Sequence, residues 1–184
     1  MGARDSTRRT LYTIGHSTRS FEELVDVLRA HGVRCLVDIR TIPRSRTNPQ
    51  FDADTLPGAL AAAGLDYRLL RGLGGRRGKS KDVPESVNAG WRVQAFHNYA
   101  DYATTPAFRA ALDELLALAA KTTCAIMCSE AVWWRCHRRI VADHVLARGV
   151  PVVHLFSVDK SQVATLTPFA RVAEDLRVTY PSEA

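Results

Sequence analysis

Late in the chain there are two apolar runs, at residues 124–127 and 150–155. In the segment between them, the apolar positions follow a helical spacing. Gly149 separates this helical segment from the second run, as expected where a helix ends. This order of patterns is typical of a strand, a crossover helix and a second, parallel strand. The chain opens in the same way, with apolar runs at residues 11–14 and 35–39 around an amphipathic stretch. The alternation predicts an α/β fold of three layers, with a mostly parallel central sheet flanked by helices.

Helix signals mark the segment between the first two runs. Ser17 or Ser20 is suited to begin this helix, because a serine hydroxyl can accept a hydrogen bond from a backbone N–H of the first turn. Glu22 and Glu23 follow in that turn, where negative charge is favourable, and Gly32 marks the end of the helix.

Further elements are expected along the rest of the chain: helices at residues 56–63, 106–120 and 168–176, and a short strand at residues 66–70. Residues 72–90 contain five glycines, four basic residues and few apolar ones, which predicts a long mobile loop that acts as a lid over the site. We expect the whole chain, residues 1–184, to form a single domain, because its length suits one hydrophobic core.

The formal net charge of +6 favours anionic partners, either a nucleic acid or an anionic small molecule such as a nucleotide. The chain contains no apolar run of about 18 residues, so we expect neither a membrane-spanning helix nor a membrane partner. Residues 1–10 are basic but lack the apolar stretch of a secretory signal. The four cysteines do not have the spacing of a disulfide scaffold, which favours a reduced, cytoplasmic protein. Two of them, Cys35 and Cys124, lie within apolar runs and are expected to be buried.

Reactive side chains collect directly after residues 124–127, with Cys128 and Glu130 followed by Cys136 and His137. In open α/β sheets, ligands bind just beyond the carboxyl ends of the strands. A thiol at a strand end that faces a helix N-terminus has a lowered pKa, and nearby basic residues lower it further. We therefore predict Cys128 as a nucleophile or redox thiol, with Glu130 and His137 as acid/base groups. In the alternative interpretation, one cysteine is buried and the other only packs against the helix.

The same residues permit a metal-site hypothesis, in which Cys128, Cys136, His137 and a carboxylate are the ligands. Seven residues lie between the two cysteines, whereas zinc knuckles have about two to four. Adjacent residues such as Cys136 and His137 rarely point at one metal ion. We therefore expect no metal ligand and no cofactor, and keep a metal-binding protein as an alternative.

Charged and polar residues also follow the apolar run at residues 35–39. Asp38 and Arg40 point to one side of this strand end, and Arg44 and Ser45 come shortly after them. Guanidinium groups match phosphate or carboxylate groups with two parallel hydrogen bonds, so we expect this segment to bind the anionic substrate. The alternative is a solvated basic loop in which Asp38 and Arg40 form a structural pair.

His16 follows the first apolar run, at a third strand end. If the three strands are parallel, one pocket is lined by His16, Asp38, Arg40, Cys128 and Glu130. In such a pocket His16 is expected to act as an acid, a base or an orienting group.

Three further residues are expected to bind the substrate. Arg138 follows His137 directly and is expected to hold the anion together with Arg40 and Arg44. Tyr67 and Tyr99 belong to a set of aromatic residues near arginines, and such rings can stack a nucleic-acid base. The alternative for both tyrosines is a place in the core.

Six segments along the chain form a recognisable series: TIGHSTRSFEEL, LVDIRTIPRSR, NPQF, LGG, YADY and MCSEAVWWRCHRRIVAD. With them the chain resembles the bacterial and archaeal domain-of-unknown-function family 488, over about residues 12–154. The resemblance implies an α/β fold, a core of about residues 12–156, and a pocket built from the GHS, DIR, CSE and CHR segments; it implies no activity. Members of the family often have a proline between CSE and CHR, where this chain has Trp133 or Trp134.

We therefore expect an enzyme that acts on a nucleotide-like or nucleic-acid substrate through a cysteine, glutamate and histidine site at the sheet edge. Two alternatives remain: a non-catalytic module that binds nucleic acid or nucleotides, and a metal-binding protein. An enzyme is expected to show an accessible Cys128 of low pKa or a buried Glu130 of raised pKa. A binding module is expected to show a continuous basic stripe.

Overall fold

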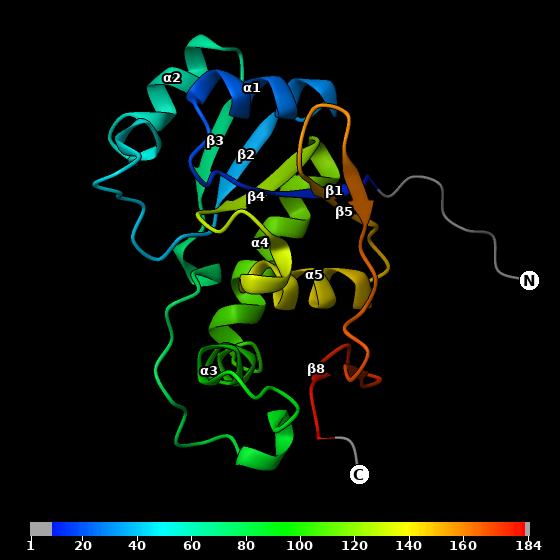
Figure 1. The fold of residues 1–184 in the computed structure, drawn as a ribbon. Helices are drawn as coiled ribbons and strands as arrows, with labels where there is room; N and C mark the ends of the chain where they lie inside the picture. The colour runs from blue at the N-terminus through cyan, green and yellow to red at the C-terminus, as the bar shows by residue number, and fades with distance from the viewer. Residues whose placement is uncertain (1–8, 183–184) are drawn as a thin grey trace, which may run out of the picture.

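The structure is a computed structural model, and it describes residues 9–182. Its main feature is a six-stranded sheet with the strand order β3-β2-β4-β1-β5-β6 (Figure 1). The strands are β1 (Leu11–Gly15), β2 (Cys35–Asp38), β3 (Asp66–Leu69), β4 (Cys124–Cys128), β5 (Val152–Leu155) and β6 (Ser161–Val163). All neighbouring strands are parallel except β5 and β6, which are antiparallel. The predicted α/β fold with a mostly parallel sheet is therefore confirmed.

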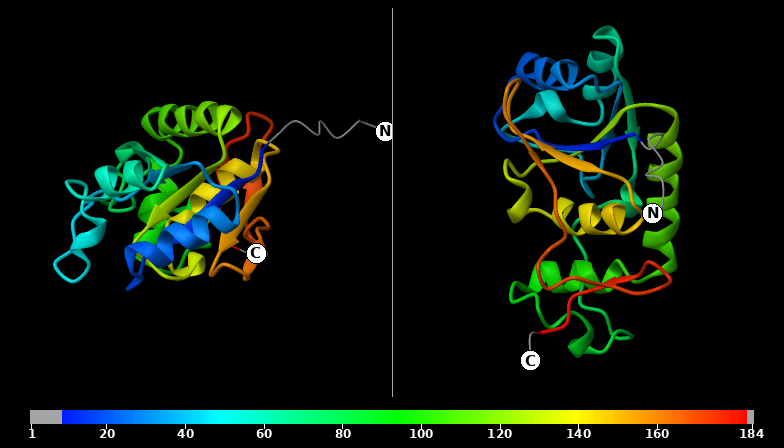
Figure 2. Two further views of the ribbon diagram at one scale, coloured as in Figure 1. Left: turned by 90° about the horizontal axis from the view of Figure 1, so that it is seen from above. Right: turned by 90° about the vertical axis from the view of Figure 1, so that its right-hand side faces the viewer.

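Helices cover both faces of this sheet and so form the three layers. On one face lie α1 (Phe21–Ala30) and α2 (Leu56–Ala62), whereas α4 (Pro106–Lys121) and α5 (Arg138–Ala147) lie on the other (Figure 1). The helix α3 (Gln94–Tyr102) lies farther from the sheet, beyond α5, as both side views show (Figures 1 and 2).

The central strands are buried on both faces. In β4, Cys124 and Ile126 belong to the core under α4 and α5, whereas Ala125 and Met127 belong to the core under α1 and α2. Because both faces of such a strand are covered, its sequence is a continuous apolar run rather than an alternation of apolar and polar residues. Exposed polar side chains can follow only where the strand ends, and Ser129 is the first of them.

The first helix begins and ends at the signals in the sequence. Ser20 is its N-cap: the Ser20 hydroxyl accepts a hydrogen bond from Glu23 N, and Glu23 accepts one from Ser20 N, which forms a capping box. Gly32, just after the helix, has a φ of 70°, a conformation that glycine adopts without strain. The other predicted cap, Ser17, lies instead in the turn that leaves β1.

The predicted helix at residues 168–176 is wrong. This region forms two short antiparallel strands, β7 (Arg171–Val172) and β8 (Val178–Thr179). The chain reverses between them with Leu176 at a φ of 65°, a left-handed conformation that an α-helix does not contain. Val178 is the strand residue of this hairpin that belongs to the core. With so few buried positions, the apolar residues of this segment show no regular spacing from which strands could be predicted.

Residues 72–90, the predicted mobile loop, are attached to α3 near both ends. Tyr99 Oη donates a hydrogen bond of 2.7 Å to Leu73 O, and the buried Asn88 Nδ2 donates one of 2.8 Å to Asp101 Oδ1. The stretch between these two attachments is mostly exposed, and its mobility stays a prediction.

Among the described residues, no helix is both long and apolar enough to cross a membrane. The larger part of the basic N-terminal stretch, residues 1–8, lies outside the described residues. All four cysteines are free thiols, and the expected burial of Cys35 and Cys124 is confirmed.

Candidate functional site

Three strand ends meet at one edge of the sheet. Gly15, the last residue of β1, lies beside Cys128, the last residue of β4, and Asp38 at the end of β2 lies beside Met127. The pairing continues past the strands, because His16 N donates a hydrogen bond of 2.9 Å to Cys128 O. Residues that follow the three strands therefore lie side by side at the carboxyl edge of the sheet.

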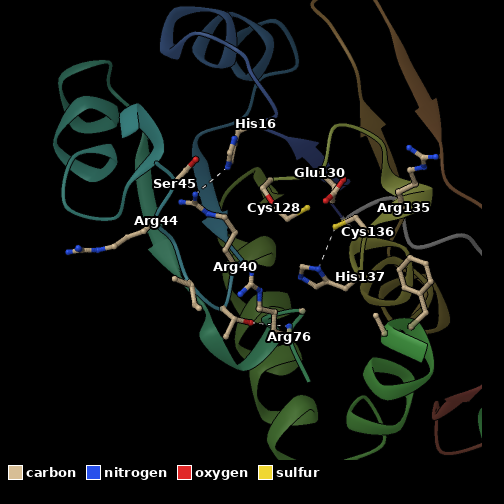
Figure 3. A pocket seen from close by; sticks show the side chains of 16 residues that line it. His16, Arg40, Arg44, Ser45, Arg76, Cys128, Glu130, Arg135, Cys136 and His137 are labelled. Carbon is tan, nitrogen blue, oxygen red and sulfur yellow. Dashed lines mark hydrogen bonds between the residues drawn. The ribbon is translucent and has the colours of Figure 1, made fainter. Parts of the chain in front are cut away.

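A pocket of about 390 Å³ opens at this edge (Figure 3). The predicted site residues that line it are His16, Arg40, Arg44, Ser45, Cys128, Glu130 and His137. Four predicted site residues, all of them in the described part of the chain, lie outside its lining: Asp38, Arg138, Tyr67 and Tyr99. The lining also contains Thr41 and Arg135, which were not predicted as site residues, together with Phe96. Gly75 and Arg76, from the predicted lid, and Cys136, from the metal-site hypothesis, line it as well.

Gly15 allows the loop after β4 to pack directly on β1. A Cβ atom at position 15 would lie 1.8 Å from the backbone oxygen of Glu130, closer than any two such atoms can approach. The same oxygen accepts a hydrogen bond of 2.7 Å from the Arg138 guanidinium. The backbone of this loop, which carries Cys128 and Glu130, is thus fixed from two sides.

Asp38 and Arg40 form a buried pair. The guanidinium donates to both carboxylate oxygens of Asp38, at 2.9 and 2.6 Å, and to Phe51 O at 2.6 Å. Asp38 is fully buried behind Arg40 and also accepts a hydrogen bond of 2.7 Å from Tyr67 Oη. Asp38 therefore does not line the pocket as predicted; it holds Arg40 and Tyr67 in place, which is the structural alternative for this pair.

His16 is held as a neutral, oriented imidazole. Its Nδ1 lies 2.9 Å from Ser17 O, to which it donates, so its Nε2 accepts from Arg40 Nη1 at 3.3 Å. Burial, with the charge of Arg40 as a further contribution, lowers the pKa of His16 below its ordinary value. The ring also stacks on Phe51, with 4.4 Å between ring centroids. Of its predicted roles, this geometry favours that of an orienting group for Arg40.

Cys128, Cys136 and His137 form a compact cluster on the floor of the pocket (Figure 3). One ligand atom from each residue lies within 4.8 Å of the other two, and Cys136 Sγ lies 3.5 Å from His137 Nδ1. Although adjacent residues rarely point at one metal ion, the side chains of Cys136 and His137 face one point here. Cys136 is extended (φ −132°, ψ 149°) and His137 is the helical N-cap of α5 (φ −57°, ψ −16°), and this change of backbone conformation turns both side chains toward Cys128.

The acidic thiol of the pair is Cys136, not Cys128. Burial raises the pKa of Cys128 above its ordinary value, and its hydrogen bond to Cys136 raises it further. Burial also raises the pKa of Cys136, but the hydrogen bond from Cys128 and the neighbouring Arg138 outweigh it and lower this pKa to about 7. Cys128 is only 2% exposed, so the prediction of an accessible, acidic Cys128 is wrong.

Arg138 lies beneath the two sulfurs rather than in the pocket. Its side chain is 1% exposed and donates to Glu130 O and, at 3.4 Å, to Thr13 Oγ1. Its backbone N–H donates to Cys136 Sγ at 3.4 Å. Burial lowers the pKa of Arg138, but the charges of Cys128 and Cys136 outweigh it and raise this pKa. Arg138 therefore stabilises negative charge on sulfur, where the sequence analysis expected a direct substrate contact.

The charged groups at the mouth of the pocket differ in direction. In Figure 3, Arg76 reaches into the pocket and the exposed carboxylate of Glu130 lies next to the sulfurs, whereas Arg44 and Arg135 point away from them. Arg44 pairs instead with Asp54 at 2.6 Å. Glu130 lies at the open side of the pocket, so neither of the two marks expected of an enzyme, an accessible and acidic Cys128 or a buried Glu130, is found. These directions leave Arg76 as the best-placed cation for an anionic substrate.

Neither predicted tyrosine lines the pocket. Tyr99 is fully buried and its ring packs at 5.1 Å, between centroids, from that of His137. Tyr67 is half-buried and bonded to Asp38. The aromatic ring that lines the pocket is that of Phe96, at the start of α3.

Trp133 explains how the loop between the CSE and CHR segments holds its shape with tryptophan in place of proline. Residues Trp133–Arg135 form a short 3-10 helix. The Trp133 ring stacks on His154 of β5, with 4.6 Å between centroids and 8° between planes, and its Nε1 donates to Gln162 Oε1 at 3.1 Å. The loop is therefore fixed to the strands β5 and β6.

The fold and the pocket define an α/β protein with a cysteine and histidine cluster at the carboxyl edge of its sheet. More specifically, the chain belongs to the family described as domain of unknown function DUF488, whose model matches residues 20–145. The matched region includes Arg40, Arg76 and the whole cluster, whereas His16 precedes it. Among curated proteins and solved structures, none matches the chain.

Proposed function

We propose that this protein is an enzyme that acts on a small, anionic, nucleotide-like substrate bound in the pocket at the sheet edge. The observation that carries this proposal is the convergence of two buried sulfurs and an imidazole on the floor of a pocket with a basic wall. A guanidinium buried beside two thiols and an oriented imidazole is a costly arrangement for packing alone, and ionisable groups with shifted pKa values cluster at functional sites.

The size and lining of the pocket support a small substrate. A volume of about 390 Å³ falls in the range of pockets for small molecules. In the described part of the chain, the Arg76 guanidinium forms no salt bridge, so it is available for a phosphate or carboxylate. Phe96 contributes an aromatic side chain to the lining, and the net charge of +6 would attract an anion at low salt.

The residues divide into a reactive group and a framework. Cys128, Cys136 and His137 form the reactive centre, and Glu130 at the open side is placed to move a proton to or from the substrate. Four further predicted residues, Asp38, Arg40, His16 and Arg138, position these groups through the hydrogen bonds described above.

The test combines binding and turnover on the full chain. Nucleoside mono-, di- and triphosphates, cyclic nucleotides and short oligonucleotides would be screened by calorimetry for binding and by mass spectrometry for conversion. We expect Arg76→Ala to weaken binding and Cys136→Ser to abolish conversion while binding persists. Cys124→Ala is the matched control, because Cys124 is a buried thiol at the other end of β4.

The same screen distinguishes the rival function of a non-catalytic binding module. A module would bind members of the panel without converting any of them, and Cys136→Ser would bind as the wild type does. Preference for oligonucleotides over mononucleotides would also favour the module. Binding of nothing in the panel would contradict both interpretations.

We also propose a cytoplasmic, reducing setting for this activity. All four cysteines are free thiols, and the close pair Cys128 and Cys136 needs a reducing environment to remain so.

A further inference from the structure

Three side chains at the floor of the pocket present the atoms that soft divalent cations prefer. Two thiol sulfurs and one imidazole nitrogen, from Cys128, Cys136 and His137, lie within 4.8 Å of one another. Thiolate and imidazole ligands together select zinc and its close relatives over magnesium or calcium. We propose that these three residues bind a divalent cation of the zinc type, with the fourth coordination position open to the pocket.

The distances suit a tetrahedral ion. With bonds of about 2.3 Å to sulfur and about 2.0 Å to nitrogen, a sulfur and a nitrogen on one tetrahedral zinc ion lie about 3.5 Å apart. Cys136 Sγ and His137 Nδ1 are 3.5 Å apart. The upper limit of 4.8 Å for the whole set requires only a small movement of Cys128 toward the other two.

The imidazole is oriented as metal-binding histidines are. His137 Nε2 lies 3.0 Å from Ile39 O, a backbone acceptor, so Nε2 carries the proton and Nδ1 keeps its lone pair. A histidine ligand almost always donates its other N–H to such an oxygen, which fixes both the tautomer and the plane of the ring. Tyr99 and Gly75 pack against the ring of His137. His137 thus points a free lone pair at the sulfurs before any ion is present.

The surroundings of the sulfurs stabilise thiolates. The backbone N–H of Arg138 donates to Cys136 Sγ at 3.4 Å, and the Arg138 guanidinium is buried beneath both cysteines. Two thiolates and a neutral imidazole neutralise a dication. With the cation bound, the only net charge of this group is therefore that of the Arg138 guanidinium. On binding, the cation replaces the thiol protons, which pass to solvent.

The fourth position faces the substrate side. All three residues line the pocket, and Glu130 is exposed beside them. Zinc sites with three protein ligands and an open position are typical of catalytic zinc, whereas structural sites have four protein ligands. The inference thus deepens the proposed function by naming the ion at its reactive centre. Its test needs no substrate, so either proposal can fail while the other stands.

The experiment measures metal binding to the full chain. Reduced protein, stripped with a chelator, would be titrated with Zn²⁺ in competition with a chromophoric indicator, and separately with Co²⁺. We expect one equivalent of zinc, and a cobalt complex with the absorption bands of thiolate ligation and tetrahedral geometry. Cys128→Ser, Cys136→Ser and His137→Gln should each lose at least about 100-fold in zinc affinity. Cys124→Ala should bind as the wild type does.

A second measurement uses the wild type alone, so it does not depend on the folding of any variant. Zn²⁺ added to the reduced protein in a weakly buffered solution should release the thiol protons to solvent, and the release should be complete at one equivalent of zinc. The proposal is wrong if the wild type leaves the zinc bound to the indicator, or if zinc releases no protons. It is also wrong if Cys136→Ser keeps wild-type affinity, or if mild oxidation of zinc-treated protein still joins Cys128 to Cys136.

Discussion

Gly75 lies directly against the ring of His137, and a Cβ atom at position 75 would stand 2.4 Å from His137 Nδ1 and 2.7 Å from its Cγ. The ring cannot turn aside freely, because Nε2 is bonded to Ile39 O and Tyr99 packs beside it. A glycine of the loop thus sets the position of a group on the floor of the pocket.

Gly75→Ala should therefore move the imidazole of His137 without altering any cluster residue. We expect zinc affinity to fall at least about tenfold and the hydrogen bond to Ile39 O to weaken. Competition titration and the nitrogen chemical shifts of the His137 ring would measure the two effects. Gly78→Ala is the control in the same loop, because a Cβ there meets nothing within 4 Å. Equal affinities for the two variants would contradict this role of Gly75.

Gly15→Ala should destabilise the fold. The added carbon would overlap the backbone oxygen of Glu130, which cannot yield as the tip of a flexible side chain can, so we expect a loss of about 3 kcal/mol or more. Gly58→Ala should instead stabilise the protein by about 0.5–1 kcal/mol, because Gly58 lies in α2 with open space around it. Urea unfolding of both variants checks the opposite signs, and a destabilised Gly58→Ala would contradict the local geometry.

Arg40→Ala should act mainly on stability. Removing it leaves the fully buried Asp38 carboxylate without its cation, which costs about 3–5 kcal/mol in comparable buried pairs. Arg44→Ala removes a pair of similar length whose side chains are 69% and 76% exposed, so its unfolding curve should match the wild type closely. Chemical denaturation compares the two. An Arg40→Ala protein of wild-type stability that has lost anion binding would show that Arg40 is instead a ligand.

His144 should make the protein sensitive to acid. Burial, with Arg148 and Arg109 as further contributions, lowers the pKa of His144 from 6.5 to about 3. The unfolded chain takes up this proton below pH 6.5 and the folded chain does not. The free energy of unfolding should therefore fall as the pH drops from 6.5 toward 3, by at most about 1.4 kcal/mol per pH unit from this group.

His144→Leu tests this expectation, because it removes the titrating ring while keeping an apolar contact with Phe108. Denaturation between pH 7 and pH 4 should show a shallower loss of stability than in the wild type. Leu60→Ala, which changes the packing on the other face of the sheet and no titrating group, should shift the whole curve by a constant amount. Parallel curves for His144→Leu and the wild type would mean that His144 does not govern the acid response.

The sheet and most helices could be predicted from the sequence. A strand that is buried on both faces has an apolar run as its sequence, and Ser20 and Gly32 mark the two ends of a helix. The C-terminal hairpin could not be predicted in this way. Its strands contain two residues each, and its turn depends on the left-handed conformation of Leu176, which leaves no pattern in the sequence.

The site was predictable to the level of the strand ends and no further. Parallel strands bring His16, Arg40 and Cys128 to one edge, and this follows from order along the chain. Which sulfur meets the imidazole depends on the backbone turn at Cys136, and the roles of Gly75 and Arg76 depend on how a distant loop folds back. Such placements arise from tertiary contacts that spacing does not encode.

Arg138 gives the cluster a consequence for the whole molecule. The Arg138 guanidinium is buried under the sheet edge, where it donates hydrogen bonds to Thr13 of β1 and to Glu130 O in the loop after β4. In the described part of the chain, no carboxylate pairs with it. Its counter-ion is the thiolate of Cys136, which the Cys128 thiol stabilises by a hydrogen bond. Alkylation or oxidation that removes this negative charge would leave a buried cation without a counter-ion, so the melting temperature of this protein should report the chemical state of its two pocket cysteines.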